Sequence, residues 1–138
     1  MYFCSMTRSM IIKGLIIPMV VLLASCKGSV NREWSLENAS SSTIEVTAAL
    51  LATSDTIYEV FEPGEWRVLT ITTEDWGNSE PQMAWEVFSY IYIINTDSSE
   101  YKTNWTQNRN WYRFFEQTKR RPDHFEQTYR LIVTDEDF

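Results

Sequence analysis

The sequence has little glycine, proline, cysteine, histidine and positive charge, and each shortage excludes a class of function. With four glycines and four prolines in 138 residues, it has neither a collagen-like repeat nor a glycine-rich phosphate-binding loop. The single histidine, His124, excludes a two-histidine zinc motif. The formal charge of -7 argues against a nucleic-acid partner, because binding to phosphates needs a basic surface.

Hydrophobic residues make up 43% of the chain and aromatic residues 14%, with six tryptophans. This composition is typical of a globular protein, and the length suits one domain of modest size. Bulky rings fill a thin core efficiently, so most of these rings are expected inside the fold.

The first 25 residues have the order of an export signal. Arg8 and Lys13 precede an apolar run at 15–24, which is shorter than the roughly 20 residues of a membrane-spanning helix and fits a signal-peptide core. The run ends in Leu23-Ala24-Ser25-Cys26, which resembles the lipobox of bacterial lipoproteins. The resemblance implies cleavage before Cys26 and attachment of fatty acyl chains such as palmitate, which anchor the protein in a membrane. A plain secretory signal and an uncleaved anchor are the alternatives.

Lipidation of Cys26 would leave the exported chain without a free thiol, because Cys4 lies in the removed segment. Disulfides and thiolate metal sites are then excluded, and stability must come from packing. Lys27 follows the cysteine. In well-studied lipoproteins an aspartate at that position favours retention in the inner membrane, so the outer membrane is the expected location. Translation from Met10 instead of Met1 would remove Cys4 as well.

The chain therefore divides into a signal peptide at 1–25, a lipidated cysteine and tether at 26–32, and a single β domain at 33–138. Within that domain apolar residues recur with a period of two, which predicts strands. The predicted strands cover 33–38, 44–50, 57–61, 66–72, 84–94, 101–105 and 129–133.

Two segments carry additional expectations. The run at 84–94 has apolar residues on both faces, which predicts a central strand covered on both sides. The segment 110–117 fits a strand or one short helix. Together the patterns predict an all-β fold, a small antiparallel sandwich or barrel of about six to eight strands. In this plan the chain is similar to uncharacterised short bacterial lipoproteins, and that likeness implies no activity.

Charge is unevenly distributed. Residues 32–100 contain thirteen acidic and two basic residues, whereas 101–134 contain seven basic and three acidic ones. The basic part alternates rings with cations, a combination that stacks on bases or sugars while neutralising anions. For an exported protein this predicts an envelope glycan or protein as partner and no nucleic acid. The candidate binding residues are Trp105, Arg109, Trp111, Arg113 and Arg120. Alternatively, the rings face the core, the cations neutralise the acidic half, and 119–122 is a solvated loop.

The sequence predicts no catalytic site, metal site or cofactor. His124 follows Asp123, but neighbours in an extended chain point in opposite directions, and His124 is expected in a loop. Asp135 and Asp137 lack the surrounding ligands of a calcium loop. Glycoside hydrolysis needs a pair of carboxylates, and among nineteen acidic residues close pairs arise by chance, as at Glu59, Glu62 and Glu65.

These observations favour a non-catalytic, lipid-anchored protein of the cell envelope that acts as a binding or structural module. One alternative is a membrane-held inhibitor or immunity protein against a lytic enzyme, whose basic surface the acidic half would attract. Another is a small carrier of an apolar ligand, in which the rings would line a cavity.

Overall fold

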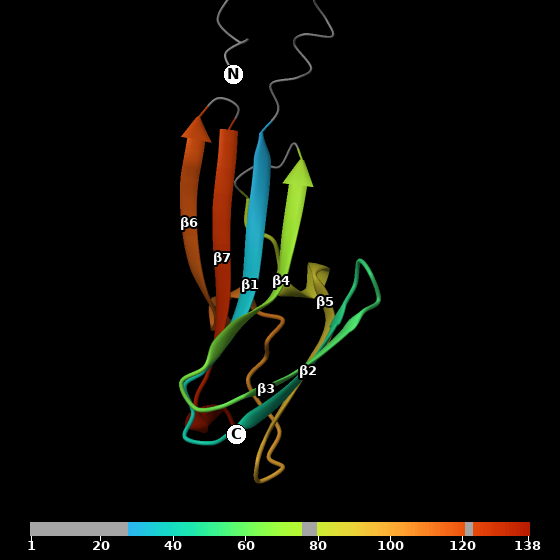
Figure 1. Cartoon of the computed structure of the whole chain (residues 1–138), viewed down its shortest axis with the longest axis vertical. Helices are drawn as coiled ribbons and strands as arrows, with labels where there is room; N and C mark the ends of the chain where they lie inside the picture. Colours follow the sequence, from blue (N-terminus) through green and yellow to red (C-terminus); the bar gives the residue numbers. More distant parts are fainter. Residues whose placement is uncertain (1–27, 76–79, 121–122) are drawn as a thin grey trace, which may run out of the picture.

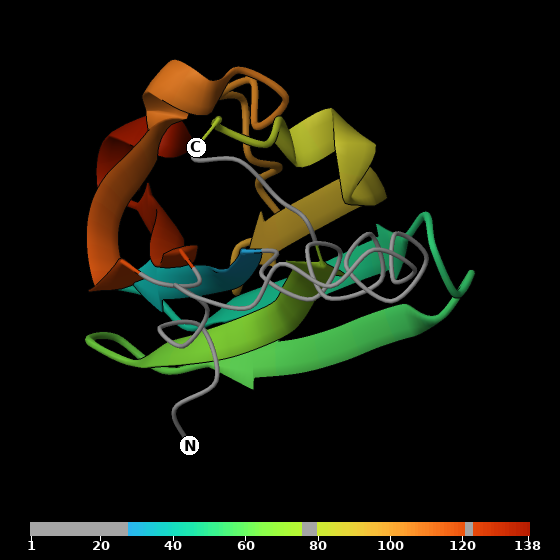
Figure 2. The ribbon, with the colours of Figure 1, turned by 90° about the horizontal axis from the view of Figure 1, so that it is seen from above.

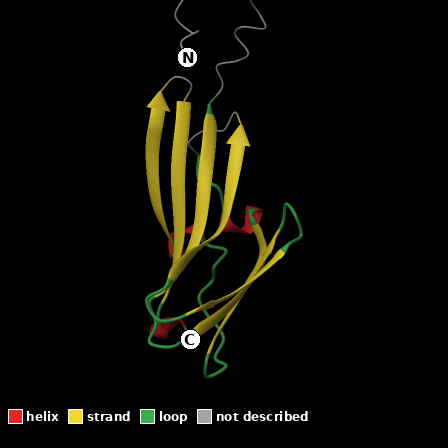
Figure 3. Cartoon of the chain, viewed as in Figure 1, coloured by secondary structure: helices red, strands yellow, loops and turns green. Residues whose placement is uncertain are grey.

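The computed structural model describes residues 28–75, 80–120 and 123–138, so the signal peptide and Cys26 lie outside the described residues. Strands dominate this part of the chain, and its helical segments are short 3-10 turns (Figure 3). In chain order the elements are β1 (Ser29–Asn38), β2 (Ile44–Leu50), β3 (Thr56–Phe61), β4 (Trp66–Asp75), η1 (Ala84–Glu86), β5 (Phe88–Asn95), η2 (Asn108–Asn110), β6 (Trp111–Arg120), β7 (Asp123–Val133) and η3 (Asp135–Asp137).

The strands form two sheets, which confirms the predicted all-β fold. Sheet A has four strands in the order β4-β1-β7-β6, and sheet B has three in the order β3-β2-β5 (Figure 1). Four of the five strand pairings are antiparallel, as expected, but β1 and β7 are parallel. A parallel pair needs a long connection, and here most of the chain lies between the two strands.

The first strand begins four residues earlier than predicted, at Ser29 instead of residue 33. Arg32, expected in the tether, is buried in β1: its Nε donates to Gln127 Oε1 at 3.3 Å and its Nη1 to Glu74 Oε2 at 2.8 Å. The alternation of apolar and polar residues does not reveal this end of β1, because a charged residue, Arg32, occupies a buried position. Its guanidinium group can be buried because it forms hydrogen bonds within the fold.

Sheet A is longer than the region that sheet B covers. The start of β1, the end of β4, the end of β6 and the start of β7 lie at one end of the molecule, and sheet B lies toward the other (Figure 1). Viewed from that end, sheet A curves from β6 on one side to β4 on the other (Figure 2).

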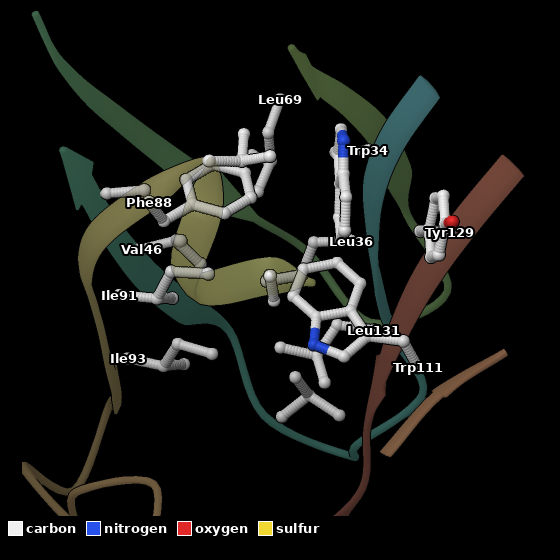
Figure 4. Close-up of a cluster of buried hydrophobic side chains, with 14 of the residues drawn as sticks. Trp34, Leu36, Val46, Leu69, Phe88, Ile91, Ile93, Trp111, Tyr129 and Leu131 are labelled. Carbon is white, nitrogen blue, oxygen red and sulfur yellow. The ribbon is translucent and has the colours of Figure 1, made fainter. Parts of the chain in front are cut away.

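The core lies between the sheets and is centred on Trp34 of β1. Its indole ring stacks on Tyr129 of β7 at a centroid distance of 4.1 Å and meets Phe88 and Trp111 edge-on at 5.9 and 5.1 Å. Aliphatic side chains from both sheets surround these rings (Figure 4), among them Leu36, Val46, Leu69, Ile91, Ile93 and Leu131. The rings thus occupy the space between the sheets, where offset and edge-to-face contacts are favourable.

Asn38, at the end of β1, connects the two sheets through a buried side chain. Its Nδ2 donates to the carbonyl oxygens of Ser42 at 2.8 Å and Phe61 at 3.0 Å, and its Oδ1 accepts from Ser40 N at 3.0 Å and Ser40 Oγ at 2.6 Å. Both donor and both acceptor positions of the amide are therefore used.

The last strand, β7, begins at Asp123 instead of residue 129, and two other predicted strands differ in kind. The segment 84–94 begins with η1, and β5, which follows, lies at the edge of sheet B, so it is not a central strand. Its outward tyrosines are exposed instead of covered. The segment 101–105 is not a strand, although Glu100 forms an isolated bridge with Ile94. The ambiguous segment 110–117 lies largely in β6.

The segment 101–105 is held in place by η3. Asp137 Oδ1 accepts a hydrogen bond from Thr103 Oγ1 at 2.5 Å, and Lys102 N donates to the Asp137 carbonyl oxygen at 2.8 Å. Phe138 meets the Tyr101 ring edge-on at 6.4 Å, and both pack against the core. Irregular backbone thus closes this side of the core.

Candidate functional site

β6 is the most exposed strand of the described chain. It lies at the edge of sheet A, and each of its residues except Trp111 is exposed. An edge strand has unpaired backbone groups along one side, and this one extends past the region that sheet B covers. The strand therefore offers accessible side chains on both of its faces.

The five predicted binding residues do not form one surface. Trp111 is 3% exposed and belongs to the core, and its Nε1 donates to the carbonyl oxygen of Trp105 at 2.7 Å. Trp105 is half-buried and packs against the core. The ring of Trp111 faces Trp34 instead of solvent, so it does not lie on the surface with the other candidate binding residues. Arg109, Arg113 and Arg120 are exposed.

Four of the described cations, Arg32, Arg67, Lys102 and Arg130, have carboxylate or carbonyl partners. Arg32 pairs with Glu74 at 2.8 Å, and Arg130 pairs with Glu37 at 3.3 Å. Arg67 pairs with Glu59 at 2.7 Å and with Glu65 at 2.9 Å, and Lys102 donates to the backbone oxygen of Phe138. Four carboxylates of the acidic half are thus paired with Arg32, Arg67 or Arg130.

The remaining described cations make neither ion pairs nor side-chain hydrogen bonds within the described part of the chain. All four fall between residues 109 and 120, which we call the basic segment: Arg109, Arg113, Lys119 and Arg120. The alternative in which these cations neutralise the acidic half is therefore wrong for the four. Lys119 and Arg120 lie in β6 and not in a loop. A surface cation without a partner is available to an anionic ligand at little desolvation cost.

Rings accompany these cations on both faces of β6. Arg113 and Phe115 oppose Tyr129 and Gln127, so they share the side of sheet A that faces the core, beyond the region where it is covered. Phe115 stacks on Phe125 at 5.6 Å. Tyr112 and Phe114 point to the opposite, outer face of sheet A.

His124 contacts the side chains of Ser29 and Glu126 through its two ring nitrogens. His124 lies in β7 and not in a loop. Its Nδ1 lies 2.6 Å from Ser29 Oγ, and its Nε2 lies 3.1 Å from Glu126 Oε1. Asp123 accepts a hydrogen bond from Gln117. These contacts tie β7 to β1 and β6.

The carboxylates near Pro63 and Gly64 have structural partners. The pKa of Glu65 is lowered, chiefly because its carboxylate accepts a hydrogen bond from the backbone N–H of Glu62. Desolvation opposes this shift, and the nearby Arg67 adds to it, so the carboxylate stays ionised. Glu62 Oε2 accepts from Thr43 Oγ1 at 2.7 Å. General-acid catalysis needs a carboxyl group with a raised pKa, which is the opposite of the shift at Glu65.

Among the described residues, no group of three or more His, Cys, Asp and Glu side chains is arranged to hold a metal ion. Asp135 Oδ1 accepts from both N and Oγ of Ser41 at 2.9 Å, and Asp137 Oδ2 accepts from Thr134 N at 2.8 Å. Both carboxylates thus hold the turn that follows β7.

Sequence reasoning missed a group of exposed tyrosines on the outer face of sheet B. Tyr58 of β3 and Tyr92 of β5 both lie opposite Thr47 of β2, and Tyr90 lies opposite Ala49. We call these five residues the tyrosine face. The alternation of Tyr90 and Tyr92 with buried Ile91 and Ile93 was visible in the sequence, but it was interpreted as a strand covered on both sides.

Comparisons of the chain with protein-family models, curated proteins and solved structures found no match. Within residues 28–75, 80–120 and 123–138, no helix has the length and apolar character needed to cross a bilayer.

Proposed function

We propose that this is a lipid-anchored, non-catalytic protein of the cell envelope, expected in the outer membrane, whose β domain binds an anionic envelope glycan through the basic segment. The sequence Leu23-Ala24-Ser25-Cys26 supports the anchor. β1 begins three residues after Cys26, a distance of at most about 11 Å in an extended chain, so the folded domain would remain close to the membrane.

One observation carries the binding role. The four described cations without a partner all fall between residues 109 and 120, although the protein has a net charge of -7. Arg113 stands beside Phe115 on the same side of β6. A guanidinium group next to an exposed ring can contact a phosphate or carboxylate while the ring contacts the adjoining sugar.

The alternatives have less support. A carrier of an apolar ligand needs an internal cavity, whereas Trp34, Phe88, Trp111 and Tyr129 pack directly on one another between the sheets. An inhibitor of a basic lytic enzyme would use the acidic half, where Arg32 and Arg67 already engage three of the carboxylates.

Binding is tested with the full-length protein, isolated lipopolysaccharide and purified peptidoglycan. Reversing two charges together, Arg113→Glu and Arg120→Glu, should weaken binding by roughly tenfold or more, because two cation contacts become repulsive. Glu116→Lys, on the same exposed strand, should strengthen binding. Equal binding by all three proteins would contradict the proposed site.

The anchor is tested separately by the intact mass of protein purified from its native host. Acylation should add the mass of fatty acyl chains at Cys26, and Cys26→Ser should abolish it and release the protein from membranes. A bare Cys26 in a protein that remains soluble would refute the anchor while leaving the glycan test unaffected. Inhibition of lysozyme by the wild-type protein would favour the inhibitor instead.

A further inference from the structure

We propose that the tyrosine face is a second binding surface, which takes a neutral β-linked glycan chain. Tyr58 is 60% exposed, and Tyr90 and Tyr92 are each 44% exposed. β2 is the central strand of sheet B, with β3 on one side and β5 on the other, so these rings flank β2 on both sides. Between Tyr58 on one side and Tyr90 and Tyr92 on the other, β2 contributes Thr47 and Ala49 to the outer face of the sheet. Their side chains are small and do not stand over the tyrosine rings.

Two of the rings are held in position by hydrogen bonds. Tyr58 Oη donates to Glu45 Oε2 at 3.0 Å, and Tyr92 Oη donates to Glu100 Oε1 at 3.1 Å. These hydrogen bonds, followed by desolvation, raise the pKa of both tyrosines, so the hydroxyls remain protonated donors. A ring that is already fixed loses less conformational freedom when a ligand stacks on it.

The spacing of the rings suits an extended ligand. Tyr58 and Tyr92 face the same residue, Thr47, from two different strands, which places their Cα positions about two strand spacings apart, or roughly 9.5 Å. This is about the length of one disaccharide unit in a β-linked chain. A chain that crosses β2 could therefore place one sugar ring near each tyrosine.

The charge of this face selects an uncharged ligand. The outward positions of β2, β3 and β5 include Glu45 and no cation, and Glu100 lies beside Tyr92. Carboxylates repel a polyanion but accept hydrogen bonds from sugar hydroxyls. The tyrosine face thus differs in chemistry from the basic segment, and it depends neither on that segment nor on the lipid anchor.

A glycan fits this arrangement better than a protein partner does. Protein interfaces concentrate their large anchor residues at the centre of the contact, where water is excluded. Here the centre holds Thr47 and Ala49, and the rings stand on either side. Rings on the flanks suit a narrow chain that lies across the sheet.

The test measures binding of two neutral β-1,4-linked oligosaccharides, chitohexaose and cellohexaose, to the full-length protein by isothermal titration calorimetry. Wild-type protein should bind at least one of them. Tyr58→Ala and Tyr92→Ala should each reduce the affinity about two- to tenfold, the range expected for one ring contact. Tyr58→Phe, which keeps the ring, should retain most of the affinity.

Tyr112→Ala is the matched control, because Tyr112 is 63% exposed and lies on the outer face of the other sheet. It should leave the affinity unchanged. The proposal is overturned if neither oligosaccharide binds at millimolar concentration, or if Tyr112→Ala weakens binding as much as Tyr58→Ala does. Capture of an envelope protein that depends on Tyr58, without oligosaccharide binding, would also overturn it. None of these results bears on lipopolysaccharide binding by the basic segment.

Discussion

Trp34 and Tyr129 lie opposite each other on the parallel strands β1 and β7, with their rings stacked at 4.1 Å and inclined by 8°. The Tyr129 hydroxyl donates to Gln127 Oε1 at 2.7 Å and accepts from Gln82 N at 2.9 Å. One end of this pair thus belongs to the apolar core, and the other belongs to a polar network that includes Arg32.

The first prediction concerns this pair. Trp34→Ala should lower the free energy of unfolding by about 3–5 kcal/mol, because it opens a large cavity in the core. Tyr129→Phe keeps the ring and removes only the hydroxyl, so it should cost about 1–3 kcal/mol. Urea denaturation followed by circular dichroism measures both values. Equal losses of unfolding free energy in the two variants would show that ring packing is not the main source of stability at this pair.

The second prediction concerns Asn38. Asn38→Asp would direct a carboxylate oxygen at the carbonyl oxygens of Ser42 and Phe61, which now accept hydrogen bonds from the amide. Folding should then raise the pKa of the new carboxyl group above its unfolded value of about 3.9. The folded state would bind a proton more tightly, so the variant should lose stability as pH rises from about 4 to 7. Thermal unfolding across this range, with Asn38→Ala as the pH-independent control, measures the effect.

The third prediction concerns Tyr101 at alkaline pH. Burial, with a smaller contribution from the negative charge of Asp137, raises the pKa of Tyr101 to about 12 from its ordinary value of 10.0. Between pH 10 and 12 the unfolded chain would lose this proton while the folded protein keeps it, so stability should fall across this interval. Tyr101→Phe should remove that part of the pH dependence, as measured by denaturant midpoints. An unchanged slope would place the alkaline transition at another group.

The fourth prediction concerns Asp137. Its carboxylate accepts from Thr134 N at 2.8 Å, from Thr134 Oγ1 at 2.9 Å and from Thr103 Oγ1 at 2.5 Å. Asp137→Ala should cost about 1–3 kcal/mol by removing all three acceptor contacts, and Thr103→Val should cost less because it removes one. Hydrogen exchange should show the loss of protection in 101–105. Full protection of that segment in Asp137→Ala would contradict the role given to η3.

The sequence predicted most strands because alternation directly reports one buried face. β2 matches its predicted range, and β3 and β4 begin within one residue of theirs. Which strands pair with each other was harder to predict from the sequence. No local pattern identifies β7 as the parallel neighbour of β1, because that contact depends on the arrangement of the whole chain. The expected strand at 101–105 shows the same limit, since alternating apolar residues also occur in irregular backbone that packs on a core.

The candidate surfaces were harder to predict than the fold. Trp111 and Tyr112 are neighbours in sequence, yet one is in the core and the other is exposed, because β6 points successive side chains to opposite faces. The choice between those faces was fixed by its pairing with β7. In the same way Tyr92 is exposed because it points to the outer face of sheet B, over which no described segment packs.

The position of β1 between β4 and β7 has a consequence for biogenesis. Ser29 and His124, which face each other across these strands, are 95 positions apart. A chain that is synthesised with its amino end first would leave β1 without its second neighbour until nearly all of the chain has been made. Late closure of this kind slows folding and leaves one side of β1 open to non-native pairing until β7 completes the sheet.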